Sequence, residues 1–281
     1  MNVLSKYIDN RDIHIDGHIH LFTKDKYLFD YYDPKSIGIN TCINTWVGFA
    51  DIELNDLESY NGHMVEIYKN YIKKHWNSSQ ILLATATTAK EAIEIYNKFP
   101  QYIKGFGEFK LYHNYRGEEV NLDKISEIRK ICSFSAKHGN LPIYIHYSLI
   151  NPKRFKVLNN LLRDFPTVPV VLCHCGIAVN QEDKDYAFNM ALSLQHSYSN
   201  LWLDISFSGA RYLYKNPLLM NNLIKERCFF GTDINVNVFK ESNKDYVNDP
   251  QKYCDDQFKY INDLKEYIAS DKNIKTLFKI K

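Results

Sequence analysis

Two kinds of hydrophobic pattern alternate along the 281 residues of this chain. The first is a short, apolar run rich in β-branched residues, of the length expected for a buried strand. Eight such runs predict strands over residues 12–20, 38–46, 81–88, 103–112, 142–148, 169–176, 200–206 and 227–235.

The second pattern is a longer segment whose apolar residues recur three or four positions apart, which is typical of an amphipathic helix. In one of these segments Asn121 can cap the start of the helix and Gly139 can end it. The pattern predicts helices over residues 57–75, 89–99, 122–138, 153–164, 184–195, 210–225 and 251–268.

This alternation favours one particular α/β architecture. Strands that are separated by helices pair in parallel, because each helix returns the chain to the starting edge of the sheet. Eight strand-helix units in a chain of this length favour a closed (β/α)8 TIM barrel over an open doubly wound sheet. No linker rich in Pro, Gly or Ser interrupts residues 1–281, so a single domain is expected.

Composition narrows the class of protein further. The hydrophobic fraction of 45% is ordinary for a globular chain, and the net charge of +2 without a basic block argues against a nucleic-acid partner. No apolar run reaches signal-peptide or membrane-span length, so a cytoplasmic protein without a membrane partner is expected. The six cysteines contain no C-x-x-C pair, which argues against a disulfide scaffold or a zinc ribbon.

Ionisable residues stand at the ends of most predicted strands. The C-terminal ends of the strands form the active-site face of a TIM barrel. The residues concerned are His18, His20, Glu108, Lys110, His146, His174, Asp204 and Asp233. Each would cost several kcal/mol if it were buried without a partner, and a shared metal ion is the natural partner for so many imidazoles and carboxylates.

The same residues carry a family resemblance. His18 and His20 as H-x-H, with Glu108 or Lys110, His146, His174 and Asp233, resemble the amidohydrolase superfamily of metal-dependent hydrolases. The phrases LPIYIHYS, VVLCHCG, LWLDIS and CFFGTDIN are most similar to its amidohydrolase-2, or amidohydrolase-related, branch. The phrase GFGEFKLY is similar to the fourth strand of metal-dependent deoxyribonucleases and phosphotriesterase-like proteins.

The resemblance implies a divalent metal, with Zn²⁺ favoured and Mn²⁺ or Fe²⁺ as alternatives. In a two-ion arrangement Glu108, or a carboxylated Lys110, would bridge the ions, and His146 and His174 would bind the second. In a one-ion arrangement His18, His20, His146 and Asp233 would hold the ion, and His174 would polarise the substrate. Both arrangements stay open here, although Glu108 is favoured over Lys110 as the ligand.

The implied activity is hydrolysis of a small organic substrate with an amide, lactone, ester or phosphoester bond. Asp233 and His174 would be the catalytic residues, with Asp233 accepting the proton of the attacking water and passing it to the leaving group. Two alternatives remain, a metal-dependent non-oxidative decarboxylase and a metal-dependent deoxyribonuclease.

Further residues near the strand ends receive smaller roles. We expect five of them to contact the substrate: Lys110, Tyr112, Arg116, Tyr147 and Arg211. Asp16 shares a face with His18 and His20 and is expected to orient one of them. Cys173 and Cys175 have the opposite parity to His174, so we expect both to face the helix layer. The substrate and the oligomeric state, including a homo-oligomer, stay open.

Overall fold

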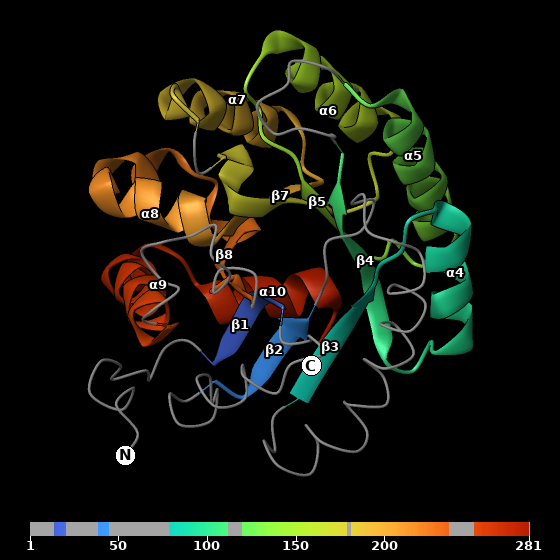
Figure 1. Ribbon diagram of the computed structural model, residues 1–281, viewed down its shortest axis with the longest axis horizontal. Coiled ribbons are helices and arrows are strands. Elements are labelled where there is room, and N and C mark those ends of the chain that lie inside the picture. Colours follow the sequence, from blue (N-terminus) through green and yellow to red (C-terminus); the bar gives the residue numbers. More distant parts are fainter. Residues whose placement is uncertain are drawn as a thin grey trace.

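A ring of parallel strands surrounded by helices makes up the computed structural model (Figure 1), which describes residues 14–20, 39–44, 79–111, 120–178, 181–235 and 250–280. The strands pair in the order β8-β7-β6-β5-β4-β3-β2-β1-β9, and each pair is parallel. They are β1 Ile15–His20, β2 Thr41–Asn44, β3 Ser79–Ala84, β4 Ile103–Lys110, β5 Ile143–His146, β6 Val170–Leu172, β7 Leu201–Ile205, β8 Cys228–Phe230 and β9 Ile234–Asn235.

The last two strands close the ring. β8 pairs with β7, whereas β9 pairs with β1 through Ile19 opposite Ile234. Between them the chain turns at Asp233, whose φ of 53° lies in the left-handed region. The eighth predicted strand is therefore one segment that bends and completes the barrel, and the predicted (β/α)8 fold is confirmed.

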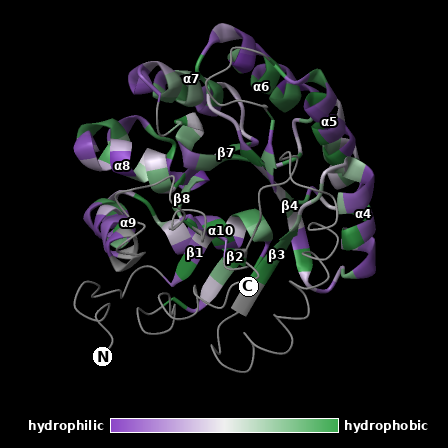
Figure 2. Cartoon of the chain, viewed as in Figure 1, coloured by the Kyte–Doolittle hydropathy of each residue, from purple (hydrophilic) through white to green (hydrophobic). Residues whose placement is uncertain are grey.

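Helices cover the outside of the ring (Figure 1) and turn mainly hydrophobic residues toward it (Figure 2). They are α4 Ala89–Lys98, α5 Leu122–Lys137, α6 Pro152–Asp164, α7 Lys184–Ser197, α8 Phe207–Lys215, α9 Pro250–Leu264 and α10 Ser270–Phe278. The chain leaves α5 through Gly139, whose φ of 89° favours glycine, as the sequence predicts. None of the helices in the described ranges combines the length and apolar character that crossing a membrane requires.

Two helix predictions differ from the structure. The predicted helix over residues 210–225 starts earlier and stops at Lys215, because Pro217 lacks an N–H and begins a 3₁₀ turn instead. The predicted helix over residues 251–268 ends at Leu264, and α10 follows it as a separate, unpredicted helix. The helix predicted over residues 57–75 lies outside the described residues.

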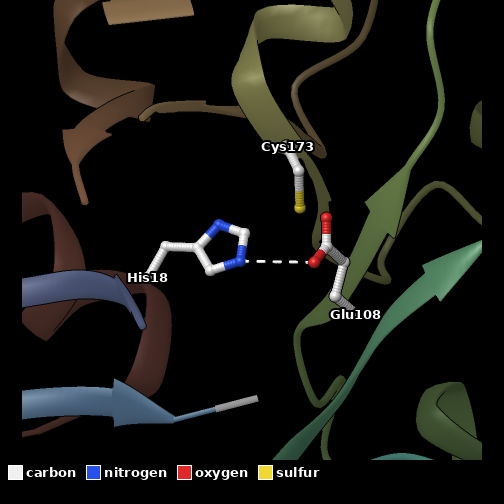
Figure 3. A group of neighbouring side chains, drawn as sticks. All are labelled: His18, Glu108 and Cys173. Atoms are coloured by element: carbon white, nitrogen blue, oxygen red, sulfur yellow. Dashed lines mark ion pairs between the residues drawn. The ribbon is translucent and has the colours of Figure 1, made fainter. Parts of the chain in front are cut away.

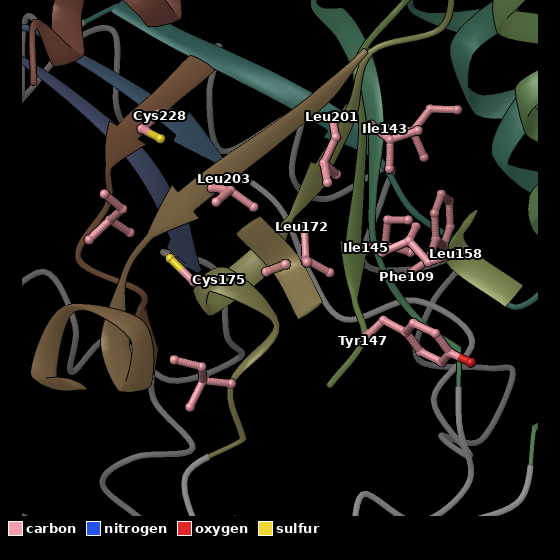
Figure 4. Packing of buried hydrophobic residues seen from close by; sticks show 14 of the residues in the cluster. Phe109, Ile143, Ile145, Tyr147, Leu158, Leu172, Cys175, Leu201, Leu203 and Cys228 are labelled. Carbon is pink, nitrogen blue, oxygen red and sulfur yellow. The ribbon is translucent and has the colours of Figure 1, made fainter. Parts of the chain in front are cut away.

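The apolar residues form two clusters on opposite faces of the strands. On β5, Tyr144 belongs to the cluster inside the barrel, whereas Ile143 and Ile145 belong to the cluster between barrel and helices (Figure 4). α10 closes one end of the inner cluster with Ile274 and Leu277. Apolar side chains therefore fill that end of the barrel. The polar residues at the C-terminal ends of the parallel strands lie at the other end.

α10 is anchored to the strands by hydrogen bonds. The Asp271 carboxylate accepts from the backbone N–H of His14 and Ile15 at 2.8 and 3.0 Å. The Ser270 hydroxyl accepts from the N–H of Phe230 at 2.9 Å. These contacts hold the start of β1 and the last residue of β8, the two strands that lead to His18, His20 and Asp233.

Candidate metal centre

The strand ends bring six of the predicted site residues together. His18 and His20 come from β1, Glu108 from β4, His146 from the end of β5, His174 from the turn after β6 and Asp233 from the bend between β8 and β9. Among these six, two groups have ligand atoms within 4.8 Å of one another: His18, His20 and Asp233, and Glu108, His146 and His174. We call His18, His20 and Asp233 the β1 half of the centre, and His146 and His174 the β5 half.

The β1 half has the spacing of metal ligands. The Nε2 atoms of His18 and His20 lie 3.2 Å apart. Asp233 Oδ1 lies 3.0 Å from His20 Nε2 and 3.7 Å from His18 Nε2. Two ligands of a tetrahedral zinc ion with bonds of 2.0–2.1 Å are separated by about 3.3 Å. The three side chains therefore fit a divalent ion between them.

Glu108 lies between the two halves. Its Oε2 atom is 3.4 Å from His18 Nε2 and 3.3 Å from His20 Nε2. Its Oε1 atom is 2.7 Å from His146 Nδ1 and 3.5 Å from His174 Nε2. One carboxylate thus presents one oxygen to each half, which is the arrangement of a ligand that bridges two ions.

The chemistry of the Glu108 carboxylate also fits a cation. The side chain is buried, and within the described residues Oε2 accepts no hydrogen bond. A buried carboxylate oxygen without a donor is costly, and a divalent ion beside it would remove that cost. The donor set of imidazoles and carboxylates suits Zn²⁺, Mn²⁺ or Fe²⁺.

The electrostatics of the six side chains are strongly coupled. Burial disfavours the charged form of His20, yet the Asp233 and Glu108 carboxylates raise the pKa of its imidazole to about 9. Asp204 and Glu108 likewise raise the pKa of His18 well above its usual value. Against the same burial, the imidazoles hold the pKa of Glu108 and of Asp233 below its ordinary range. The carboxylates therefore stay ionised and available to a cation.

A tight turn after β6 brings His174 into the centre. Alternation along β6 places Val171 and Cys173 inside the barrel, which would send His174 outward. Instead His174 and Cys175 have φ values of 56° and 55°, so the backbone turns and His174 faces the other ligands. Consecutive non-glycine residues in the left-handed region are uncommon and tend to mark functional sites.

The prediction that Cys173 faces the helix layer is wrong. Its thiol points toward His18 and Glu108 (Figure 3), and the three ligand atoms lie within 4.8 Å of one another. The prediction failed because the alternation holds through Cys173 and breaks only at His174. Cys175 does lie in the outer cluster as predicted (Figure 4), where its thiol donates to the carbonyl of Asp204.

The sequence groups Asp204 with the possible metal ligands and gives Ser206 no role, and in the structure both support the histidines. Asp204 Oδ2 lies 2.6 Å from His18 Nδ1 and accepts from the Ser206 hydroxyl at 2.7 Å. The Ser206 oxygen in turn lies 2.8 Å from His174 Nδ1. The D-x-S spacing at the end of the strand predicted over residues 200–206 was the available signal, since residues two apart share a face.

Asp16 has a different role from the one predicted. Its carboxylate accepts from the backbone N–H of His18 at 3.2 Å, and from the N–H and hydroxyl of Thr232 at 3.0 and 2.7 Å. It therefore ties β1 to the bend before Asp233. The register of β1 against β2 shifts between Asp16 and Ile19, so Asp16 no longer follows the alternation of the two histidines.

The predicted substrate contacts have different outcomes. Tyr147 is 1% exposed and packs in the outer cluster (Figure 4). The guanidinium of Arg154 lies 5.7 Å from its ring. The prediction that it lines the mouth is wrong, because alternation sends it to the face opposite His146. Lys110 ends β4 and is half-buried, and Arg211 is exposed on α8. Tyr112 and Arg116 lie outside the described residues.

Comparison with known proteins gives one family and a consistent fold. The family model described as amidohydrolase matches residues 100–279. The structure is similar to a probable 2-pyrone-4,6-dicarboxylic acid hydrolase from Acinetobacter baumannii, with a TM-score of 0.58 and 16% identity over 94% of this chain and 98% of that one. Comparison with curated protein sequences found no match.

Two further solved structures have the same fold at lower identity. A TatD family hydrolase from Entamoeba histolytica aligns with a TM-score of 0.56 and 12% identity, over 95% of this chain and 98% of that one. An amidohydrolase from Burkholderia multivorans with bound zinc aligns with a TM-score of 0.57 and 10% identity, over 96% of this chain and 100% of that one. At these identities the likeness establishes the barrel alone.

Proposed function

Since the chain belongs to the amidohydrolase family and is an enzyme of that superfamily, we propose that it hydrolyses a small organic substrate at a divalent metal centre. The substrate bond is an amide, lactone, ester or phosphoester. The observation that carries the proposal is the position of Glu108, whose two oxygens face different sets of histidines. Zinc is the favoured metal, as in the zinc-bound amidohydrolase from Burkholderia multivorans.

In this proposal His18, His20 and Asp233 would hold one ion, His146 and His174 would hold a second, and Glu108 would serve both. A divalent ion in such a site supplies Lewis-acid activation of water and of the substrate oxygen. The chain's own contribution is to hold the ligands in place before the metal arrives. The hydrogen bonds of Asp204 to His18 and of Asp16 to the backbone of β1 support that arrangement.

Asp233 is the proposed proton carrier. The neighbouring imidazoles keep the pKa of its carboxyl below the ordinary range despite burial, so it is ionised at neutral pH and able to accept the proton of the attacking water. Its backbone N–H donates to the carbonyl of His18 at 2.8 Å, which fixes the residue relative to β1. The same carboxyl then returns the proton to the leaving group.

The two alternative activities are less well supported by the described residues. A non-oxidative decarboxylase would use the one-ion arrangement, in which the position of Glu108 between both halves has no purpose. A deoxyribonuclease would need a basic surface for the phosphate backbone, and the net charge of +2 gives little sign of one. A small molecule is therefore the proposed substrate.

The test is a hydrolysis screen with metal-free and Zn²⁺-reconstituted protein on amide, lactone, ester and phosphoester substrates. We expect turnover of at least one class that depends on added metal and is lost in Asp233→Asn. Asp263→Asn, which makes the same change on the exposed side of α9, should keep full activity. Carbon dioxide release without hydrolysis would favour the decarboxylase, and full activity of Asp233→Asn would contradict the assigned role.

A further inference from the structure

The hydroxyl of Ser206 does not cap the helix that begins next to it. Ser206 is the N-cap residue of α8, yet its side chain makes no capping hydrogen bond. By contrast, four other helices are capped by the side chains of Thr88, Asn121, Asn151 and Asp183. An N-cap side chain normally stabilises the first turn of its helix, and this hydroxyl makes other contacts instead.

Those contacts define where the protons lie. The Asp204 carboxylate can only accept, so Ser206 donates its single proton to Oδ2 at 2.7 Å. The Ser206 oxygen can then only accept from His174, whose Nδ1 lies 2.8 Å away and must carry a proton. The same carboxylate accepts from His18 Nδ1 at 2.6 Å. Both imidazoles are therefore held as donors at Nδ1, which leaves Nε2 for the centre.

The first turn of α8 also fixes His174 by packing. The ring of Phe207 meets the His174 imidazole edge-on, with the centroids 6.0 Å apart. A Cβ atom on Gly209 would lie 2.7 Å from the His174 carbonyl oxygen, so only glycine lets the helix approach this closely. His174 therefore has little freedom to move except through the orientation of its ring, which the Ser206 hydroxyl sets.

We propose that Ser206 is a positioning residue that holds the His174 imidazole for the second metal ion and links it, through Asp204, to His18 in the other half of the centre. The proposal rests on the metal centre of the proposed function. Because Asp204 still contacts His18 without the hydroxyl, loss of Ser206 should affect the two halves unequally. The affinity of the β5 half for its ion should fall about 10–100-fold, the usual effect of removing such a supporting contact.

The test compares Ser206→Ala with Ser208→Ala, which removes a neighbouring buried hydroxyl that donates to the carbonyl of Ile177. Metal-free proteins are titrated with Co²⁺ against a competing chelator. We expect wild type and Ser208→Ala each to bind two equivalents of Co²⁺. Each equivalent should bind with the same affinity in both proteins. In Ser206→Ala the first equivalent should match wild type and the second should bind about 10–100-fold more weakly.

A second measurement reports the hydrogen bond without any metal. In metal-free, ¹⁵N-histidine-labelled protein, the Nδ1 proton of His174 should give a slowly exchanging NMR signal that His174→Gln identifies by its loss. Ser206→Ala should lose this signal, and Ser208→Ala should keep it. A retained signal, or equal weakening of both ions in Ser206→Ala, would overturn the proposal. A wild type that binds no metal would instead refute the proposed function, and the NMR signal would still decide the role of Ser206.

Discussion

The two halves of the candidate metal centre differ most in their access to solvent. In the β1 half, the side chains of His18, His20 and Asp233 are 0%, 4% and 7% exposed. In the β5 half, His174 is 4% exposed, so the difference comes from His146, which is 30% exposed. The β1 half lies where the segment after β8 pairs with β1 and closes the ring. His146, by contrast, is the last residue of β5.

Because of this difference, we expect the two halves to differ in how firmly they retain an ion and in how readily a substrate reaches it. A buried set of ligands that is held from behind excludes water and should retain its ion firmly. A partly exposed ligand leaves room for a substrate to reach the centre, and its ion should exchange more readily. Glu108 contacts both sets, so it is the residue through which the two halves depend on each other.

Removing the β1 half should have the largest effect. His18→Asn combined with His20→Asn takes two ligands from the buried half, and we expect loss of both ions. Activity should fall roughly a thousandfold or more, because metal activation contributes several kcal/mol to the reaction. Metal content and turnover are measured together, with circular dichroism to verify folding. A folded double variant with wild-type metal content would contradict the claim that His18 and His20 hold an ion.

Glu108→Gln should separate the halves. The amide keeps the shape of the side chain but has no charge to share between two ions, so we expect the metal content to fall from two ions to one. Elemental analysis after dialysis against a weak chelator measures the ratio. Glu127→Gln is the matched control, since this glutamate lies on α5, where its carboxylate accepts from the N–H of Ala89. Two ions in Glu108→Gln would show that the carboxylate does not bridge.

His146→Asn should affect only the exposed half. We expect the second ion to bind about 10–100-fold more weakly, and the first to keep its affinity because its ligands are untouched. Chelator competition with Co²⁺ resolves the two equivalents. If the first ion weakened as much as the second, the two halves would be one site and the comparison would fail.

Tyr147→Phe should have the smallest effect. Its ring lies in the outer cluster, away from the centre, so kcat/KM should stay at the wild-type value. Phenylalanine keeps the ring and its packing, so the free energy of unfolding should change by less than about 1.5 kcal/mol, measured by urea denaturation. A clear rise in KM would restore the original hypothesis that Tyr147 contacts the substrate.

The sequence predicts the architecture of the centre better than its supporting contacts. Strand alternation correctly places His18 and His20 on one face, and the ends of β4 and β5 bring Glu108 and His146 together. The same rule misplaces Cys173, because the left-handed turn at His174 is a tertiary feature that no local pattern signals.

Long-range partners were equally hard to foresee. The contact of His18 with Asp204 joins β1 to β7 between residues 186 positions apart in the sequence, and its choice over Asp16 depends on a register shift in β1. By contrast, the helix predicted over residues 210–225 overlooked a local signal, since Pro217 lacks the N–H that a helix interior needs and α8 ends before it. Local chemistry was thus visible in the sequence, and pairing across the barrel was not.

The most direct test of the metal centre is anomalous diffraction at the zinc edge from crystals grown with Zn²⁺. We predict two peaks on either side of the Glu108 carboxylate, each about 2.0–2.2 Å from its ligands. One should contact His18, His20 and Asp233, and the other His146 and His174. A map with no peak within bonding distance of these side chains would contradict the account.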